Sequence, residues 1–403
     1  MSVTPATGHA YYDPYDVELN ANPYPMFRRL REEAPLYRNE QHDFYALSRF
    51  EDVRRGLADR ETFSSARGAI IELIKANIDI PRGVLIFEDP PIHTVHRNLL
   101  VRMFTPKKIR DLEPKIREFC VRSLDRLAGA ERFDFVADIG KQMPMRVIGM
   151  LLGIPEQDQE AVRDQVDAEL RTERGRPMTR YAEQGDFASG EIFADYIEWR
   201  AEHPSDDIMT ELLNVEFADE TGTTRRLTRE EILTYVTVVA GAGNETTTRL
   251  IGWAGKVLAE HPDQRRQLVQ DPSLIPSAIE ELLRYEPPAP HVARYVTRDV
   301  DYYGLAVPEG SVMMFLIGSA NRDDRQFPDG DRFDVRRDAR QHLTFGMGTH
   351  FCLGSALARM EGRIALEEIL KRFPEWQVDD DQARISPTST VRGWETLPVV
   401  IPS

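Results

Sequence analysis

Cys352 is the residue of this chain whose type and surroundings most favour reactive chemistry. Glycines stand on both sides of it, and an amphipathic helical pattern from Leu353 to Lys371 begins directly after it. A thiol at a helix N-terminus is favoured as the thiolate, because free N–H groups and the helix dipole stabilise negative charge there. Such a thiolate is a nucleophile or a metal ligand. The alternative is a buried structural cysteine, but a packed core position has no need of flanking glycines.

The ten residues from Phe345 to Gly354 resemble the haem-binding loop of the cytochromes P-450. The pattern of that loop is Phe-Gly-x-Gly-x-x-x-Cys-x-Gly, and every fixed position is filled in this chain. The resemblance implies that Cys352 is the axial ligand of the iron of haem b, and that Phe345, Gly346 and Gly354 belong to the cofactor-binding loop. A thiolate ligand pushes electron density onto the iron and favours cleavage of the O–O bond.

A long helix is predicted in the middle of the chain. Thr228 and Glu231 form a capping box, and the helical pattern then runs to Glu260. At 1.5 Å per residue this helix spans ~48 Å, so we expect it to cross the whole molecule. Its middle holds glycines at 241 and 243 and threonines from 246 to 248, which destabilise a helix. This composition favours either a local opening of the hydrogen-bond ladder at a functional site or a close crossing with another helix.

The middle of this helix also resembles a motif of the same family, Ala/Gly-Gly-x-Asp/Glu-Thr. Gly243, Glu245 and Thr246 fill its fixed positions. The resemblance implies that this segment lies over the haem face opposite Cys352 and that Gly243 leaves room for dioxygen. It also implies that Thr246 and Glu245 are catalytic. Thr246 would donate a hydrogen bond to the distal oxygen, and Glu245 would relay protons from solvent.

Four further residues are similar to those with which this family holds the two haem propionates: His93, Arg97, Arg294 and His350. His93 and Arg97 lie one helical turn apart, so both could bind one carboxylate. Arg294 falls in a predicted strand, and His350 belongs to the cysteine loop. A zinc site built on His93 and His96 is the rival interpretation, for which no third or fourth ligand stands nearby in the sequence.

Glu281 and Arg284 match the Glu-x-x-Arg motif of the family. Taken alone, the spacing indicates a surface ion pair of little worth. The resemblance implies instead a buried pair beneath the haem, joined to an arginine of a later loop, with Arg332 or Arg336 as the partner. Its expected role is to hold the cysteine loop in place.

The composition limits the classes of partner. The chain has 403 residues, 41% hydrophobic and 29% charged, with a formal charge of −16. Nucleic acid is excluded as an expected partner, because its binding needs a cationic surface. The apolar run Ser311–Ala320 falls short of the ~18 residues of a membrane span. Met1–Ala10 shows no signal-peptide pattern. We therefore expect a soluble, cytoplasmic monomer without a membrane span.

The pattern of elements indicates a fold that is mainly α with a minor β portion. Helices dominate from about residue 93 to 213, and short strands are predicted near 36–38, 44–47, 292–296, 302–303 and 312–316. The polar stretch 171–189 reads as a mobile connection that we expect to move when ligand binds. No linker or repeat divides the chain, so one domain, 1–403, is expected. This order resembles the cytochrome P-450 fold along nearly its whole length, with haem between the long central helix and the cysteine loop.

The function that the resemblance implies is insertion of one oxygen atom from O2 into a lipophilic substrate. Terpenoids, steroids and fatty acids all fit an apolar lining. The sequence contains no dinucleotide fingerprint and no cysteine cluster for an iron–sulfur centre, so electrons are expected from a ferredoxin and its ferredoxin reductase. The basic residues that either dock this partner or are ordinary surface charges are Arg102, Lys107, Lys108, Arg110, Arg359 and Arg363.

The apolar residues expected to line the substrate pocket come from three segments of the chain. They are Ile70, Ile71, Ile74, Val84, Leu85, Ile86, Val239, Ala240, Val292 and Ala293. Arg67, Lys75 or Arg82 either hold a substrate carboxylate, which would favour fatty acids, or are ordinary solvated cations of the loop. Two alternatives stand beside the enzyme. One is a thiolate-haem gas sensor without turnover, and the other is a non-haem binding protein of mainly helical fold.

Overall fold

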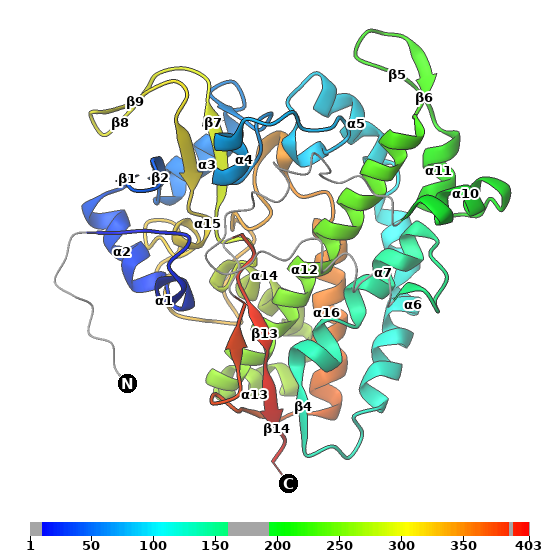
Figure 1. Cartoon of the computed structure of the whole chain (residues 1–403). Coiled ribbons are helices and arrows are strands. Elements are labelled where there is room, and N and C mark those ends of the chain that lie inside the picture. The colour runs from blue at the N-terminus through cyan, green and yellow to red at the C-terminus, as the bar shows by residue number, and fades with distance from the viewer. Residues whose placement is uncertain (1–9, 160–192, 387–389, 403) are drawn as a thin grey trace.

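The computed structural model describes residues 10–159, 193–386 and 390–402 (Figure 1). The predicted connection at 171–189 lies outside the described residues. Helices form most of the described structure. They are α1 Val17–Ala21, α2 Tyr24–Glu33, α3 Phe50–Ala58, α4 Ile71–Ala76, α5 Ile92–Val101, α6 Pro106–Asp125, α7 Met143–Leu152, α10 Ala194–Glu202, α11 Ile208–Asn214, α12 Arg229–Glu260, α13 Pro262–Gln270, α14 Ile275–Tyr285, α15 Ile317–Ala320 and α16 Ser355–Arg372. Short turns of other helix types are η1 Leu85–Phe87, η2 Phe135–Gly140, η4 Pro272–Leu274 and η5 Gly348–His350.

The strands are short and gather in small sheets. They are β1 Leu36–Asn39, β2 Phe44–Leu47, β3 Phe63–Ser64, β4 Arg132–Asp134, β5 Glu216–Ala218, β6 Thr224–Arg226, β7 Val292–Val296, β8 Val300–Tyr302, β9 Leu305–Val307, β10 Val312–Phe315, β11 Gln377–Val378, β12 Arg384–Ile385, β13 Trp394–Thr396 and β14 Pro398–Val400. The largest sheet has the order β1-β2-β10-β7-β3, with β10 parallel to β2 and the other pairs antiparallel. The prediction of a mainly α fold with a minor β portion is confirmed.

Helix α12 runs through the middle of the molecule (Figure 1). Its capping box is present: Glu231 N donates to Thr228 Oγ1 at 3.2 Å, and Thr228 N donates to the Glu231 carboxylate at 2.9 Å. The helix is continuous from Arg229 to Glu260, so of the two alternatives for its middle the structure does not show a local opening of the ladder. The threonine hydroxyls instead bond within the helix, and Thr246 Oγ1 donates to Ala242 O, four residues earlier, at 2.8 Å.

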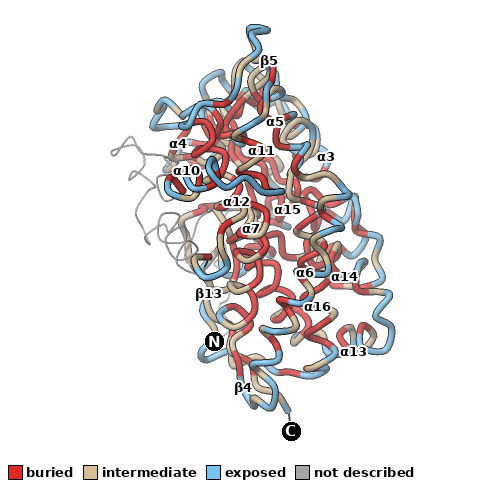
Figure 2. The backbone as a smooth tube through the Cα atoms, turned by 90° about the vertical axis from the view of Figure 1, so that its right-hand side faces the viewer, coloured by how far each residue is buried: buried red, intermediate tan, exposed pale blue. Residues whose placement is uncertain are grey.

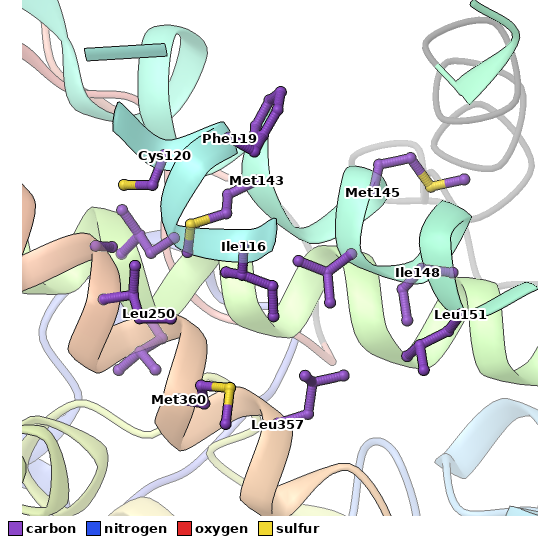
Figure 3. Close-up of a cluster of buried hydrophobic side chains, with 14 of the residues drawn as sticks. Ile116, Phe119, Cys120, Met143, Met145, Ile148, Leu151, Leu250, Leu357 and Met360 are labelled. Carbon is purple, nitrogen blue, oxygen red and sulfur yellow. The ribbon is translucent and has the colours of Figure 1, made fainter. Parts of the chain in front are cut away.

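The close-crossing interpretation holds for Gly243. A Cβ atom on Gly243 would lie 2.6 Å from Cδ1 of Ile148, so α7 can approach α12 this closely because position 243 has no side chain. Figure 3 shows Ile148 against α12. Leu250 of α12 packs against α16, where a Cβ atom on Gly362 would lie 3.0 Å from Cδ2 of Leu250. Leu250 and Leu357 belong to the same hydrophobic core (Figure 3).

The core lies between α6, α7, α12 and α16, and Figure 2 shows that buried residues follow the inner parts of these helices. The apolar spacing of Ile116, Phe119, Cys120 and Leu124 predicts that Cys120 is a core residue. It is 2% exposed in this core, and burial raises the pKa of its thiol to about 12. In the described parts of the chain, every helix is too short or too polar to cross a bilayer.

Candidate functional site

The cysteine loop, Phe345–Gly354, contains η5 and leads directly into α16. Its turn is closed by Cys352 N, which donates to Phe345 O at 2.8 Å. Burial raises the pKa of the Cys352 thiol, while the N–H of Gly354 and the cations Arg97 and Arg359 oppose that rise. These donors and charges stabilise negative charge on the sulfur, which is the form that binds a metal ion.

Glycine is required at different positions of this loop for different physical reasons. Gly346 and Gly348 have φ of +72° and +67°, the left-handed region that favours glycine. Gly354 has a φ of −82°, and a Cβ atom there would meet no atom of the described residues within 4 Å. Backbone conformation and protein packing therefore both leave position 354 open to a side chain. A flat group that lies close to the loop would explain why position 354 has no side chain, so the loop fits haem.

The four residues expected at the propionates come together from three elements. His93 and Arg97 lie on α5, Arg294 on β7 and His350 on η5. The ring centroids of His93 and His350 are 4.4 Å apart, and Arg97 Nη2 donates to the carbonyl of Phe351 at 2.6 Å. Both ring nitrogens of His93 and Nε2 of His350 are buried without a hydrogen-bond partner among the described residues.

The electrostatics of this cluster favour an anion. Burial, followed by Arg294, His93 and Arg97, lowers the pKa of His350 to about 3, and a hydrogen bond to the Glu88 backbone opposes the fall. Burial and then Arg97 lower the pKa of His93 to about 4. Burial lowers the pKa of Arg294 to about 10. Buried cationic groups that depress one another's charge are relieved by a bound dianion. The cluster therefore fits a dicarboxylate such as the two haem propionates.

The zinc interpretation fails on the position of His96. Its Nδ1 atom lies 2.8 Å from Oε2 of Glu88, and its ring packs edge-on against Tyr235 with centroids 5.6 Å apart. His96 is thus bound within α5 and the preceding loop, and does not share a ligand position with His93. In the part of the chain that the structure describes, no group of three or more His, Cys, Asp or Glu side chains could hold a metal ion.

Glu281 and Arg284 on α14 form a bidentate ion pair, at 2.7 and 2.8 Å, with both side chains fully buried. Arg284 Nη1 also donates to the carbonyls of Asn321 and Gly330, at 2.8 and 2.7 Å. The pair thus joins α14 to the segment between α15 and the cysteine loop, and the expectation of a surface pair from spacing alone is wrong.

The third member of this network is Arg337. Its Nε donates to Oε1 of Glu281 at 3.2 Å. The prediction of Arg332 or Arg336 is therefore wrong. Arg332 contributes its backbone carbonyl to Arg284, while the Arg336 side chain points to Gln267. Adjacent positions of an irregular loop point in different directions, and the turn after Asp334 decides which arginine faces inward.

A second polar contact beside the cysteine loop was missed by sequence reasoning. Arg359 of α16 donates to both carboxylate oxygens of Glu280, at 2.6 and 3.0 Å, and its guanidinium lies 4.4 Å from the ring centroid of Phe345. Burial raises the pKa of Glu280, but hydrogen bonds from His342 and Arg359 outweigh burial and hold this pKa at about 2. Glu280 precedes the Glu-x-x-Arg motif, which is the one signal that could have marked it.

The expected catalytic pair makes its contacts within α12. The Glu245 carboxylate accepts from Arg249 Nη2 at 2.9 Å, and Thr246 bonds back to Ala242 as described above. Val238, Ala242 and Thr246 share one face of the helix, and this face is partly open although α12 is otherwise largely buried. The α12 and α16 helices contact each other. The open face therefore belongs to α12, which packs against α16, the helix that begins just after Cys352.

The predicted pocket residues do not form one continuous lining. Leu85, Val239 and Ala240 belong to the large core between the helices. Val292 packs against a second core, and Ile86 is 45% exposed. Ile71, Ile74 and Ala293 belong to the core beneath the largest sheet. Val84 forms with Leu73 and Phe87 a small separate cluster, here called the loop cluster, against which Ile70 and Val238 of α12 pack. The loop cluster is therefore the part of the predicted lining that reaches the open face of α12.

The charged residues of this region have partners inside the chain. Lys75 donates to the carbonyl of His42, and Arg82 pairs with Glu220. The guanidinium of Arg67 lies 3.9 Å from the ring centroid of Tyr295. These contacts weaken the expectation that one of the three cations holds a substrate carboxylate.

The predicted basic docking residues are partly neutralised. Arg359 pairs with Glu280 and Lys108 with Glu211. Arg363 pairs with glutamates at 113 and 367. The residues of this set that stay exposed lie just before or within α6, and are Arg102, Lys107 and Arg110.

Comparisons with known proteins agree with this geometry. A sequence profile described as Cytochrome P450 matches residues 189–397. Putative cytochrome P450 123 of Mycobacterium tuberculosis H37Rv is 38% identical, covering 100% of this chain and 99% of that protein. The vitamin D(3) 25-hydroxylase of Pseudonocardia autotrophica is 34% identical, covering 100% of this chain and 99% of its own length. CYP109E1 of Bacillus megaterium in complex with testosterone is 30% identical with a TM-score of 0.85, covering 96% of this chain and 99% of that chain.

Proposed function

The chain belongs to the cytochrome P450 family of haem-dependent monooxygenases, and we propose that it oxidises a steroid-like lipophilic substrate at a haem b held by Cys352. The observation that carries the site is the cluster of buried, unpartnered imidazole nitrogens of His93 and His350 beside the cysteine loop. Haem, when bound, would supply activation of dioxygen with two electrons and two protons, so that one oxygen atom enters the substrate and the other leaves as water.

The chain's own residues bind and orient the cofactor. We propose that Cys352 Sγ holds the iron and that Gly346 and Gly354 let the loop lie flat against the ring, beside Phe345. His93, Arg97, Arg294 and His350 donate hydrogen bonds to the propionates, which supply the negative charge that this buried cluster lacks. The Glu281–Arg284–Arg337 network fixes the backbone behind the loop and touches no reacting atom.

Two residues of α12 handle protons in this proposal. The Thr246 hydroxyl, which donates to Ala242 O in the structure, can rotate about χ1 to donate into the site instead. The Glu245 side chain is 24% exposed and held by Arg249, so release from that ion pair would let its carboxylate carry protons from solvent to Thr246 Oγ1. Gly243 keeps α7 close behind this segment, and its expected contribution of room for dioxygen remains part of the proposal.

The substrate class is inferred from the lining and the relatives. The loop cluster and Val238 present apolar surface, which favours hydrocarbon skeletons over polar metabolites. Two relatives are named for, or bound to, steroid-like molecules, vitamin D(3) and testosterone. Because Lys75 and Arg82 are engaged within the chain, we rank a steroid ahead of a terpenoid or a fatty acid.

We further propose that electrons come from an acidic ferredoxin, served by its reductase. The exposed cations Arg102, Lys107 and Arg110 offer a positive patch on a chain whose formal charge is −16. Opposite charge on the partner would steer it to this patch and speed association. The enzyme acts as a monomeric, single-domain protein in this proposal.

The experiment that tests the function has two parts. The reduced CO complex should absorb at markedly longer wavelength than a histidine-ligated haem, and Cys352→Ser should abolish that band while Cys120→Ser keeps it. Ferric protein should then be titrated with a steroid, a terpenoid and a fatty acid while the haem spectrum is followed. A globin-like CO spectrum of the wild type would contradict thiolate ligation. A spectral response to small polar compounds alone would contradict the lipophilic substrate.

A further inference from the structure

Glu88 connects two segments that have separate roles in the proposed function. One is the loop that carries part of the pocket lining, and the other is α5, which carries His93 and Arg97. The Glu88 side chain is 7% exposed and His96 is fully buried. His96 Nδ1 lies 2.9 and 2.8 Å from the two carboxylate oxygens. The same carboxylate accepts from the backbone N–H of Gly83 at 2.7 Å. One buried acid thus holds both the loop and α5.

On the loop side, Gly83 fixes the path of the chain against α12. Its φ of +97° favours glycine, and a Cβ atom there would lie 3.3 Å from Cγ2 of Thr234. The next residue, Val84, belongs to the loop cluster, which Val238 of α12 contacts. The position of the Gly83 N–H therefore sets where the loop cluster lies over the open face of α12.

On the helix side, the clamp reaches the propionate cluster. His96 precedes Arg97 and follows His93 by three residues, and its ring is packed edge-on against Tyr235 of α12 at 90°. The backbone of Glu88 accepts a hydrogen bond from the His350 ring, and this bond opposes the fall of the His350 pKa that burial causes. Glu88 is therefore in contact with the loop, with α5 and with the cysteine loop.

We infer that Glu88, acting with His96, is a positioning residue that clamps the segment Gly83–Phe87 over the haem side of α12 and thereby sets substrate affinity. This inference rests on the proposed function. The clamp touches neither substrate nor reacting atoms in this account. It holds the lining in the bound conformation before substrate arrives, so less ordering is needed on binding.

A double variant and a conservative variant separate positioning from stability, whereas truncation of Glu88 does not. Glu88→Ala leaves two buried donors without an acceptor, so its effect combines lost positioning with lost stability. The double variant E88L/H96L replaces the buried pair by apolar groups of similar volume, which is often neutral for stability, but it still removes the acceptor for Gly83 N–H. Glu88→Gln is the conservative variant, because Gly83 N–H and His96 Nδ1 both lie within hydrogen-bond distance of Oε1, and an amide oxygen at that place can accept from both.

The measurements are hydrogen exchange of the amides of residues 78–87 and ligand titration of the ferric haem spectrum, both on the haem-loaded protein with testosterone as ligand. We expect E88L/H96L to speed exchange at Gly83 at least tenfold and to raise the Kd for testosterone about tenfold, with unchanged haem content and CO spectrum. Glu88→Gln should stay within threefold of wild type in both readouts. Arg82→Ala, which removes an exposed ion pair of the same loop, should leave exchange at Gly83 within threefold.

Wild-type exchange at Gly83 in E88L/H96L would overturn the clamp, as would exchange that speeds while the Kd for testosterone stays at the wild-type value. If the wild type gives a globin-like CO spectrum or no response to testosterone, the proposed function fails. The exchange comparison still decides whether the clamp exists in that case, because it needs no ligand.

Discussion

Arg337 Nε lies 3.2 Å from Oε1 of Glu281, and this contact closes a buried network that begins with the Glu281–Arg284 pair. Asp334 N donates to the same carboxylate oxygen at 3.0 Å. The network anchors the segment before the cysteine loop to α14 without any contact to the sulfur. Because both members of the pair are fully buried, each depends on the other for its charge.

Removing one member of this pair should destabilise the protein strongly. Glu281→Gln leaves the Arg284 guanidinium buried with a neutral partner, and such broken pairs cost ~3–5 kcal/mol. We expect a lower free energy of unfolding in urea and incomplete haem incorporation. An unfolding curve that superposes on the wild type would show that the pair contributes little.

Arg337 should matter more than its neighbour. Arg337→Ala removes the bond to Glu281 and a donor to the carbonyl of Pro328 at 2.7 Å, so a loss of ~1.5–3 kcal/mol is expected in the same unfolding assay. The matched control is Arg336→Ala, because that exposed side chain bonds to Gln267 alone among the contacts described for its guanidinium. Equal effects of the two variants would contradict the assignment of Arg337.

Thr246→Ala should preserve haem and substrate binding but divert electrons from product to hydrogen peroxide. Loss of a positioned proton donor typically lowers the rate by ~10²–10⁴. The control is Thr237→Ala, because Thr237 Oγ1 makes the same kind of bond within α12, to Leu233 O at 2.9 Å. Product and peroxide formed per reduced cofactor are measured for both variants. Unchanged coupling in Thr246→Ala would argue against its role with protons.

Glu361 predicts a pH dependence of stability. Burial raises the pKa of this carboxyl group on α16 from its ordinary 4.5 to about 8. The folded state therefore holds a proton that the unfolded state releases between these values, so stability is full below about pH 4.5 and falls as pH rises toward 8. We expect the slope to approach tenfold in the unfolding equilibrium constant per pH unit.

Glu361→Gln should remove this slope, because the amide does not titrate. Urea unfolding of both proteins at pH 5 and pH 8 measures the effect, and the variant should gain on the wild type at the higher pH. A constant difference between the two proteins across this range would show that Glu361 is ionised in the folded state.

Charge reversal should locate the docking patch of the electron donor. Lys107→Glu should weaken binding of an acidic ferredoxin at low salt about tenfold, and the difference should shrink at high salt because exposed charges are screened. Arg38→Glu on β1 is the control, since its side chain is 56% exposed in the β portion. Binding is measured by titrating each variant with the ferredoxin. An unchanged spectrum of the reduced CO complex shows that the haem site of each variant is intact. Equal weakening by both reversals would indicate a general charge effect.

The sequence alone determined the features that depend on neighbouring residues. The bounds of α12 follow from the Thr228 capping box and from His261-Pro262, and the turn of the cysteine loop follows from glycines at 346 and 348. These are local effects of backbone geometry and hydrogen bonding, so they are readable from spacing. The mainly helical class and the buried state of Cys120 follow from apolar periodicity in the same way.

Tertiary structure decided which distant side chains meet. Arg337 instead of Arg332 or Arg336 faces Glu281 because of the path of an irregular loop, and Glu280 meets Arg359 because α14 packs on α16. Sequence spacing carries no information on such contacts, since they depend on how whole elements pack. The Glu88–His96 contact is of the same kind, and for this reason the sequence presents His96 as a possible zinc ligand. Element packing also decides that part of the expected pocket lining lies in the core.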